Sequence, residues 1–169
     1  SQAKYWKIMP VGNSITKGEQ STDFTGFRKL LFDKLDASNV DFEFVGDDIG
    51  PDGDSRYRGF FESGAKIDYF LPGGTKDLMA QLNKNNADIV LIHLGTNNMN
   101  KDAAGPYPDP TTASGKLYTL LNDLTQRTDL TRIVVCKIIP KMDDYGQIIP
   151  KVQDFNAQIE QMFFDKFAN

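Results

Sequence analysis

The stretch Ile89-Val90-Leu91-Ile92-His93-Leu94-Gly95-Thr96-Asn97-Asn98 passes from an apolar run into a polar turn. A short, continuous apolar run that ends near a glycine is typical of a strand buried on both faces of a parallel sheet. The run from Tyr5 to Val11 has the same form, and Gly12-Asn13-Ser14 follows it. The two stretches therefore predict two buried strands, each ending in a polar turn.

Helical and strand patterns alternate along the rest of the chain. Apolar residues recur at helical spacing in 25–37, 67–71, 75–83, 112–127 and from Pro150 through Phe164, and strand patterns occupy 41–45 and 132–138. The stretch from Gly46 to Gly64 is too long for a plain connector, so we predict an irregular segment with a functional or lid-like role. The alternation predicts an α/β domain whose parallel sheet is covered on both faces, with ligands bound beyond the carboxyl ends of the strands.

Size and charge restrict the classes of partner. The 169 residues fit one domain, and we see no repeat or linker, so we predict a single domain over residues 1–169. A net charge of −4, with 19 basic residues scattered along the chain, argues against nucleic acid. No apolar stretch approaches the ~20 residues that span a bilayer, so we expect no membrane partner. The lone Cys136 is interpreted as a small buried hydrophobe, and we expect no metal and no cofactor.

The two polar turns carry the candidate chemistry. Ser14 can project into the crevice beside the first turn of a following helix, whose amides favour negative charge. Alternatively, it merely caps that turn. The Asn97 amide is a fixed hydrogen-bond donor of the kind a developing oxyanion requires, or it forms an Asx turn that ends the strand. The pattern by itself leaves both pairs of alternatives open.

Taken together, the two turns resemble a family. Val11-Gly12-Asn13-Ser14-Ile15-Thr16 and the stretch Leu91 to Met99 resemble two sequence blocks of the SGNH (GDSL-type) hydrolases, especially microbial acetylxylan esterases and related carbohydrate esterases. Further matches are Ile8-Met9-Pro10, Phe44-Val45-Gly46, Ser63-Gly64-Ala65-Lys66-Ile67 and Ile138-Ile139-Pro140. The resemblance covers nearly the whole chain. It implies a three-layer α/β/α, flavodoxin-like fold with strand order 2-1-3-4.

The resemblance also assigns roles. Ser14 is the nucleophile, and its backbone amide, the amide of Gly64 and the side chain of Asn97 form the oxyanion hole. Gly64 is alternatively a loop glycine chosen for positive φ, and both can hold at once. The implied activity is a serine esterase that removes O-acetyl or other short acyl groups from a carbohydrate such as xylan. Its partner is then a small-molecule or polysaccharide ester. The family expectation is secretion, and because Ser1 to Lys4 is polar, an exported protein has already lost its signal peptide.

Three residues depart from the family pattern, and we place them in the binding site. Asn13 and Asn98 stand where the family has Asp, so two negative charges are lost and amides donate where carboxylates only accept. Glu62 precedes Ser63-Gly64, where the family has a His-Glu-Gly-His-like stretch. It is the nearest candidate, by sequence, to substitute for a missing base.

The family's last block, Asp-x-x-His, is absent from this chain. The only histidine is His93, inside the third predicted strand, and we interpret it as structural. We expect the usual fifth strand and its helix to be missing, with Asp and His supplied by a separate C-terminal fragment, because a serine hydroxyl needs an adjacent base. The alternative is a catalytically impaired pseudoenzyme, or a carbohydrate-binding module that retains the esterase cleft. A phosphate- or nucleotide-binding domain is a third reading, but neither a Gly-x-Gly-x-x-Gly nor a Walker loop is present.

Overall fold

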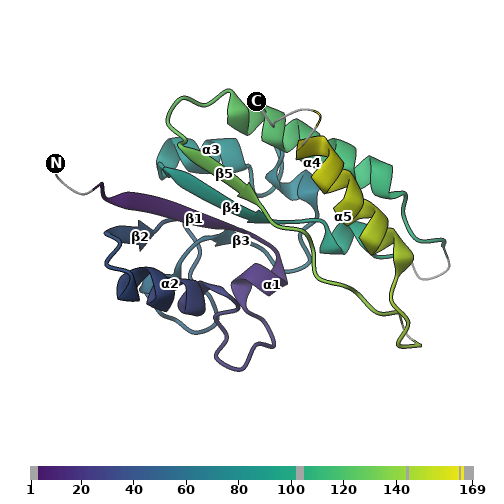
Figure 1. The fold of residues 1–169 in the computed structure, drawn as a ribbon, viewed down its shortest axis with the longest axis horizontal. Coiled ribbons are helices and arrows are strands. Elements are labelled where there is room, and N and C mark those ends of the chain that lie inside the picture. The colour runs from purple at the N-terminus through teal and green to yellow at the C-terminus, as the bar shows by residue number, and fades with distance from the viewer. Residues whose placement is uncertain (1–3, 102–104, 144, 164, 166–169) are drawn as a thin grey trace.

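A parallel sheet forms the middle of three layers (Figure 1). The structure, a computed structural model, describes residues 4–101, 105–143, 145–163 and 165. The strands are β1 (Trp6–Gly12), β2 (Phe42–Phe44), β3 (Phe60–Phe61), β4 (Ile89–His93) and β5 (Arg132–Val135). They run in the order β2-β1-β4-β5, and β3 pairs with β1 beyond the end of β2. The predicted order 2-1-3-4 is confirmed, with β4 and β5 as the third and fourth predicted strands.

Helices cover both faces of the sheet. They are α1 (Ser14–Lys17), α2 (Arg28–Ala37), α3 (Leu78–Lys84), α4 (Pro110–Thr125) and α5 (Pro150–Met162), with the 3₁₀ helices η1 (Ser55–Tyr57), η2 (Ile67–Phe70) and η3 (Thr96–Met99). Figure 1 shows α3, α4 and α5 on one side of the sheet and α1 and α2 on the other. Phe164, which the pattern assigns to the last helix, and residues 1–3 lie outside the described residues. No helix in the described part has the length and apolar character needed to cross a membrane.

Local hydrogen bonds explain why some helices begin away from their predicted ends. The Asp109 side chain accepts the N–H of Thr111, and Pro110 occupies the first turn, so α4 begins two residues before the predicted Thr112. The Asp77 side chain caps α3 in the same way through Ala80, so residues 75–77 lie outside that helix. These caps set the boundaries more firmly than the apolar spacing does.

The prediction that the stretch from Gly46 to Gly64 is irregular is wrong for part of it. It contains η1 and β3, and β3 pairs in register with β1 through Val11↔Phe60 and Gly12↔Phe61. Both phenylalanines are buried, and the pair offers apolar side chains to both faces of the sheet edge. This part of the stretch belongs to the sheet and does not cover it.

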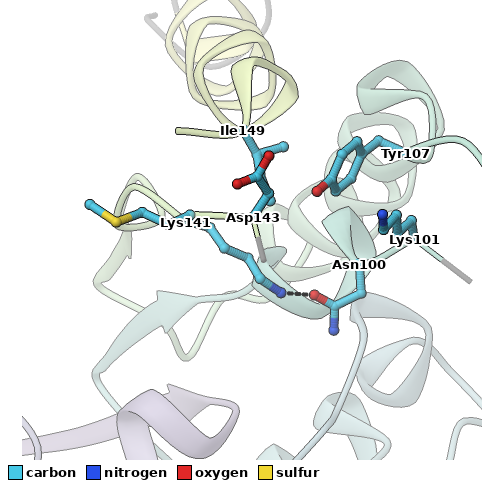
Figure 2. A pocket seen from close by; sticks show the side chains of 7 residues that line it. Asn100, Lys101, Tyr107, Lys141, Asp143 and Ile149 are labelled. Carbon is cyan, nitrogen blue, oxygen red and sulfur yellow. Dashed lines mark hydrogen bonds between the residues drawn. The ribbon is translucent and has the colours of Figure 1, made fainter. Parts of the chain in front are cut away.

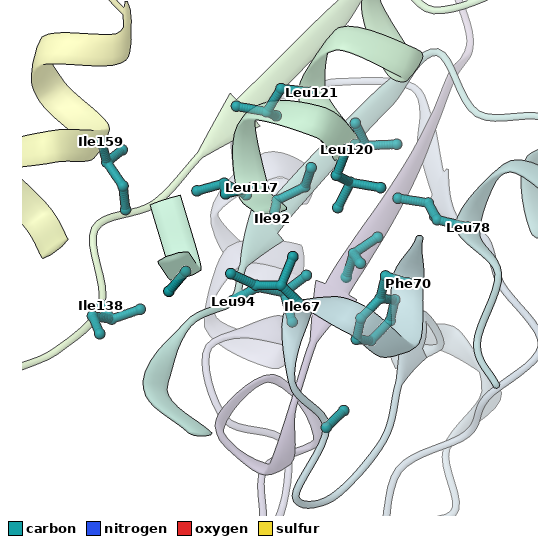
Figure 3. Close-up of a cluster of buried hydrophobic side chains, with 14 of the residues drawn as sticks. Ile67, Phe70, Leu78, Ile92, Leu94, Leu117, Leu120, Leu121, Ile138 and Ile159 are labelled. Atoms are coloured by element: carbon teal, nitrogen blue, oxygen red, sulfur yellow. The ribbon is translucent and has the colours of Figure 1, made fainter. Parts of the chain in front are cut away.

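The main hydrophobic core lies between the sheet and α3, α4 and α5. Val90 and Ile92 of β4 point into it, beside Met9 and Val11 of β1. Figure 3 shows Ile92 beside the α4 leucines, which include Leu117, Leu120 and Leu121, all buried. On this face the predicted alternation of strand and helix produces a closed core.

The opposite face of the sheet is covered unevenly. Over β2, Phe32 of α2 packs against Phe42 and Phe44, with ring centroids 4.9 and 5.8 Å apart. Over β5, Val134 is 41% exposed, although it is the register partner of Leu91 in β4. In the described residues this face is therefore open above β5, which is also an edge of the sheet.

Several connections meet at the carboxyl end of the sheet. The turn after β1 leads into α1, the segment after β3 leads to η2, and β4 leads directly into η3. Beside η3 a hollow of about 470 Å³ opens, with Asn100, Tyr107 and Lys141 in its walls (Figure 2). This end of the sheet is where a ligand site is expected in an open α/β fold.

We expect Leu117 of α4 to contribute strongly to the stability of the core between the sheet and α4. Leu117→Ala in α4 removes a fully buried side chain and leaves a cavity, so the free energy of unfolding should fall by about 2–5 kcal/mol. Leu30→Ala in α2 is the matched control, because Leu30 is 61% exposed and its loss should cost less than about 0.5 kcal/mol. Urea unfolding of both variants measures the difference. Equal losses would contradict the assignment of the core to the α4 side.

Candidate active site at the carboxyl end of the sheet

Ser14 is the first residue of α1, immediately beyond β1. Asn13 is the N-cap of that helix, and its Oδ1 accepts the N–H of Ile15 at 3.0 Å. The capping role considered for Ser14 therefore belongs to Asn13, and the Ser14 hydroxyl forms no hydrogen bond with any described residue. The Ser14 N–H lies in the first helical turn, where backbone amides have no intrahelical acceptor. Both groups are available to a ligand.

Gly12 fixes the path of the chain into this helix. It pairs with Phe61 on one side and His93 on the other, so it sits between two strands. A Cβ atom at this position would lie 2.0 Å from Oγ1 of Thr16 and 2.9 Å from the carbonyl oxygen of His93. Any side chain here would push α1, and Ser14 with it, away from the sheet. Glycine is therefore required by the close approach of the backbone.

Gly64 lies in an exposed turn after β3, and hydrogen bonds join this turn to α1 and to η3. Its φ is +72°, which agrees with the predicted positive value, and a Cβ there would have no neighbour within 4 Å. Two side chains hold the residues that flank it. Lys17 Nζ donates to Ser63 Oγ at 3.0 Å, and Asn97 Nδ2 donates to the Ala65 carbonyl at 2.9 Å. The turn is thus bonded on one side to the helix that begins at Ser14 and on the other side to Asn97.

Asn97 is half-buried and held at both ends of its amide. Nδ2 uses one N–H on the Ala65 carbonyl, and Oδ1 accepts from Asn100 Nδ2 at 3.4 Å. Because an amide nitrogen carries two donors, one N–H remains. The side chain is not used in a local Asx turn, so it can present a fixed donor at the edge of the sheet.

Asn98 and Asn13, the two predicted binding residues that replace Asp, are both buried. Asn98 Oδ1 accepts the N–H of Ile67 at 2.9 Å, and Nδ2 donates to Asp68 at 3.5 Å, so this residue joins η3 to η2. It also borders a second hollow of about 470 Å³. Asn13 Nδ2 has no hydrogen-bond partner among the described residues, and an unmatched buried donor costs about 1–3 kcal/mol. The structure therefore gives both residues framework contacts through their Oδ1 atoms.

Glu62 and His93 do not form a hydrogen bond to Ser14. Glu62 is exposed, and its backbone N–H donates to Gly12 O at 3.2 Å, while its carboxylate has no partner within the described chain. His93 is 7% exposed, and neither ring nitrogen has a partner among the described residues. Burial lowers the pKa of His93, so its imidazole is neutral near pH 7. The described residues thus place no base in hydrogen-bond contact with the Ser14 hydroxyl.

Sequence reasoning missed a charged cluster beside the turn. Ser63 Oγ donates to the Glu19 carboxylate, and Lys17 Nζ lies 3.0 Å from the same carboxylate. The hydrogen bonds from Ser63 and then Lys17 lower the pKa of Glu19. The position of Lys17 and Glu19, directly after the serine block, was the only available signal, because Ser63 is distant in sequence.

Solved structures of esterases share this fold. A family 3 carbohydrate esterase from Clostridium thermocellum is 23% identical, with 96% of this chain and 73% of that chain covered and a TM-score of 0.69. A family 3 carbohydrate esterase from Talaromyces cellulolyticus is 20% identical, with 95% and 73% covered and a TM-score of 0.71. An acetyl xylan esterase is 19% identical, with 94% and 73% covered and a TM-score of 0.63.

This chain has the SGNH-hydrolase fold. The expected three-layer architecture and strand order are confirmed by that likeness, which at such identities establishes the fold alone. No family model matches the sequence, and no protein of curated function matches it.

The charged cluster makes the stability of this SGNH-fold chain depend on pH. Because the pKa of Glu19 is lowered in the folded state, its contribution is present near pH 7 and is lost as the pH falls through the folded pKa. Glu19→Gln should therefore reduce the loss of unfolding free energy between about pH 7 and about pH 3. Ser63→Ala should flatten the profile similarly, because it removes the main hydrogen bond to Glu19. Denaturant unfolding across this range tests both variants, and unchanged slopes would contradict the cluster.

Proposed function

We propose that this chain is a serine esterase of SGNH type that removes O-acetyl or other short acyl groups from a carbohydrate such as xylan. The observation that carries the proposal is the position of the Gly64 turn, which is bonded through Ser63 to the Ser14 helix and through Ala65 to Asn97. Support also comes from the solved neighbours, which are described as carbohydrate and acetyl xylan esterases.

The proposed chemistry follows from these positions. Ser14 Oγ attacks the acyl carbon, the carbonyl oxygen becomes an oxyanion, and the alcohol of the sugar leaves once it has received a proton. Water then cleaves the acyl-serine ester and restores the hydroxyl. The donors proposed for the oxyanion are the N–H groups of Ser14 and Gly64 and the remaining N–H of Asn97. Since Asn97 is already bonded at both ends of its amide, it needs little reorganisation as the charge develops.

A base must still accept the proton of Ser14. We propose that a strand–helix segment carrying an Asp-x-x-His block supplies it, on the same polypeptide or on a separate fragment, by packing beside β5. The edge of β5 is unpaired in the described residues, and the Val134 side chain on that strand is 41% exposed. This chain covers 73% of each of the three esterases compared above, so each of them has residues that this chain does not match. A paired edge and a covered face would remove both exposed features.

Substitutions should separate the nucleophile from the oxyanion donor. Ser14→Ala should reduce hydrolysis of p-nitrophenyl acetate, and release of acetate from acetylated xylan, to the uncatalysed background. Asn97→Ala should lower kcat by about 10²–10³-fold, the usual loss for one oxyanion donor. Ser38→Ala serves as the control, because Ser38 is exposed at the end of α2 and should leave the rate unchanged. Turnover that survives in the Ser14→Ala variant would refute the assignment.

A carbohydrate-binding module without turnover is the second candidate. It is favoured by the lack of a base bonded to Ser14 and by the two Asn residues that replace Asp. For a module, titration with acetylated and deacetylated xylo-oligosaccharides should show binding of both without release of acetate. Release of acetate that depends on Ser14 would exclude the module and support the esterase.

A further inference from the structure

One side chain, that of Asn100, links the hollow beside η3 to the candidate active site. Asn100 stands in its wall, and Asn100 Nδ2 donates to Asn97 Oδ1 at 3.4 Å. On the other side Asn100 Oδ1 accepts from Lys141 Nζ, as Figure 2 shows. The hollow is therefore two side chains away from the Ala65 carbonyl to which Asn97 is anchored. These two hydrogen bonds are the link between the hollow and the candidate active site.

Three lysine ammonium groups lie around this hollow, and in the part of the chain that the structure describes none of them pairs with a carboxylate. Lys141 donates to a neutral amide oxygen, and Lys101 Nζ lies 5.5 Å from the centroid of the Tyr107 ring. A third ammonium group, that of Lys151, donates to the Tyr107 carbonyl at 2.9 Å. Within the described residues none of the three forms an ion pair. Elsewhere in the described chain many lysines do, as in Lys17–Glu19, Lys76–Asp48 and Lys116–Asp68.

One described carboxylate, Asp143, also lines the hollow, and it is engaged in its own turn. Its Oδ1 accepts the N–H groups of Tyr145 and Gln147, each at 2.9 Å. With Lys101 and Lys141 in the same walls, the described lining still carries a net positive charge. The whole chain has a net charge of −4, so the sign of the described lining differs from that of the chain.

We propose that the hollow binds a carboxylate-bearing sugar, a uronic acid unit of the ester substrate. The ammonium groups of Lys101 and Lys141 would pair with the carboxylate, and Asn100 and the Tyr107 hydroxyl would bond the sugar hydroxyls. Met142, which is 63% exposed, would supply an apolar surface for the C–H face of the ring. A volume of about 470 Å³ falls within the usual range for small-ligand sites. The inference rests on the proposed function, because it names the substrate class of the same site.

Calorimetric titration of the full chain tests the inference without requiring catalysis. The two probes are a xylo-oligosaccharide bearing one glucuronic acid and the unsubstituted oligosaccharide of equal backbone length, neither of them acetylated. The uronate probe should bind about tenfold more tightly, as expected for two lysine contacts at a partly enclosed site. Raising the salt from about 0.05 M to about 0.5 M should reduce that preference, because exposed charge pairs are screened.

Lysine variants locate the effect. Lys141→Gln and Lys101→Gln should each reduce the uronate preference about threefold, with unchanged far-ultraviolet circular dichroism as the check on folding. Lys34→Gln makes the same charge change on α2, where Lys34 forms no ion pair within the described residues, and should preserve the preference. Equal affinity for the two probes, or an equal loss in Lys34→Gln, would overturn the inference.

The titration, together with the assay of acetate release, distinguishes this inference from the proposed function. Acetate release from neutral acetylated xylan without any uronate preference would refute only the uronate site. Conversely, a lysine-dependent uronate preference in a protein that releases no acetate from acetylated xylan would refute the esterase and retain an acidic-sugar site.

Discussion

The parallel pairing of β1 with β4 is the constraint on which the candidate site depends. Successive pairs from Ile8↔Ile89 to Gly12↔His93 bring the two strands to their ends at the same level of the sheet. A slip of one residue would turn Val90 and Ile92 out of the core and expose them on the opposite face. Core packing therefore locks the register. Because the register is locked, the turns that carry Ser14 and Asn97 must leave the sheet side by side.

A buried arginine holds the first of these turns in place. The helix α1 has only four residues, too few to be stable without tertiary contacts. Arg28 is fully buried, and its guanidinium donates to the carbonyls of Thr16 and Lys17 at the end of that helix, each at 2.8 Å. It also pairs with Asp52 at 3.3 Å and lies 4.7 Å from the centroid of the Phe61 ring. The Arg28 guanidinium thus links the segment between β2 and β3 to the helix that begins at Ser14.

Local patterns predicted those parts of the fold in which the apolar runs are long. The runs that became β1 and β4 were clear, whereas β3 has two residues and no period that a sequence reading can detect. Arg28 was missed for a related reason. It lies in a stretch whose apolar spacing predicted only a helix, and its partners at Lys17, Asp52 and Tyr57 are contacts of the tertiary structure.

The candidate site was predicted from a different kind of information. The residue patterns left capping and catalysis open for Ser14, and a turn or a donor open for Asn97, so the family resemblance assigned their roles. The structure narrows the local alternatives, because Asn13 is the cap and Asn97 is bonded to Ala65 outside its own turn. It could not have been foreseen from the sequence that the Gly64 turn is held by Lys17 and Asn97 together, since three separate segments meet there.

The two Asn residues show how a site can lose charge without losing its framework. At Asn13 and Asn98 the Oδ1 atom accepts a backbone N–H, from Ile15 and Ile67 respectively, and a carboxylate oxygen would accept the same bond. Replacing Asp by Asn therefore preserves the contacts that shape the two turns and removes two negative charges from one end of the sheet. The nearby hollow carries Lys101 and Lys141 in its walls, so the change makes the local potential still more positive. An anionic substrate meets two fewer carboxylates here than it would with Asp at both positions. The two substitutions, which look like a loss of function, are therefore also consistent with a change in the charge of the substrate.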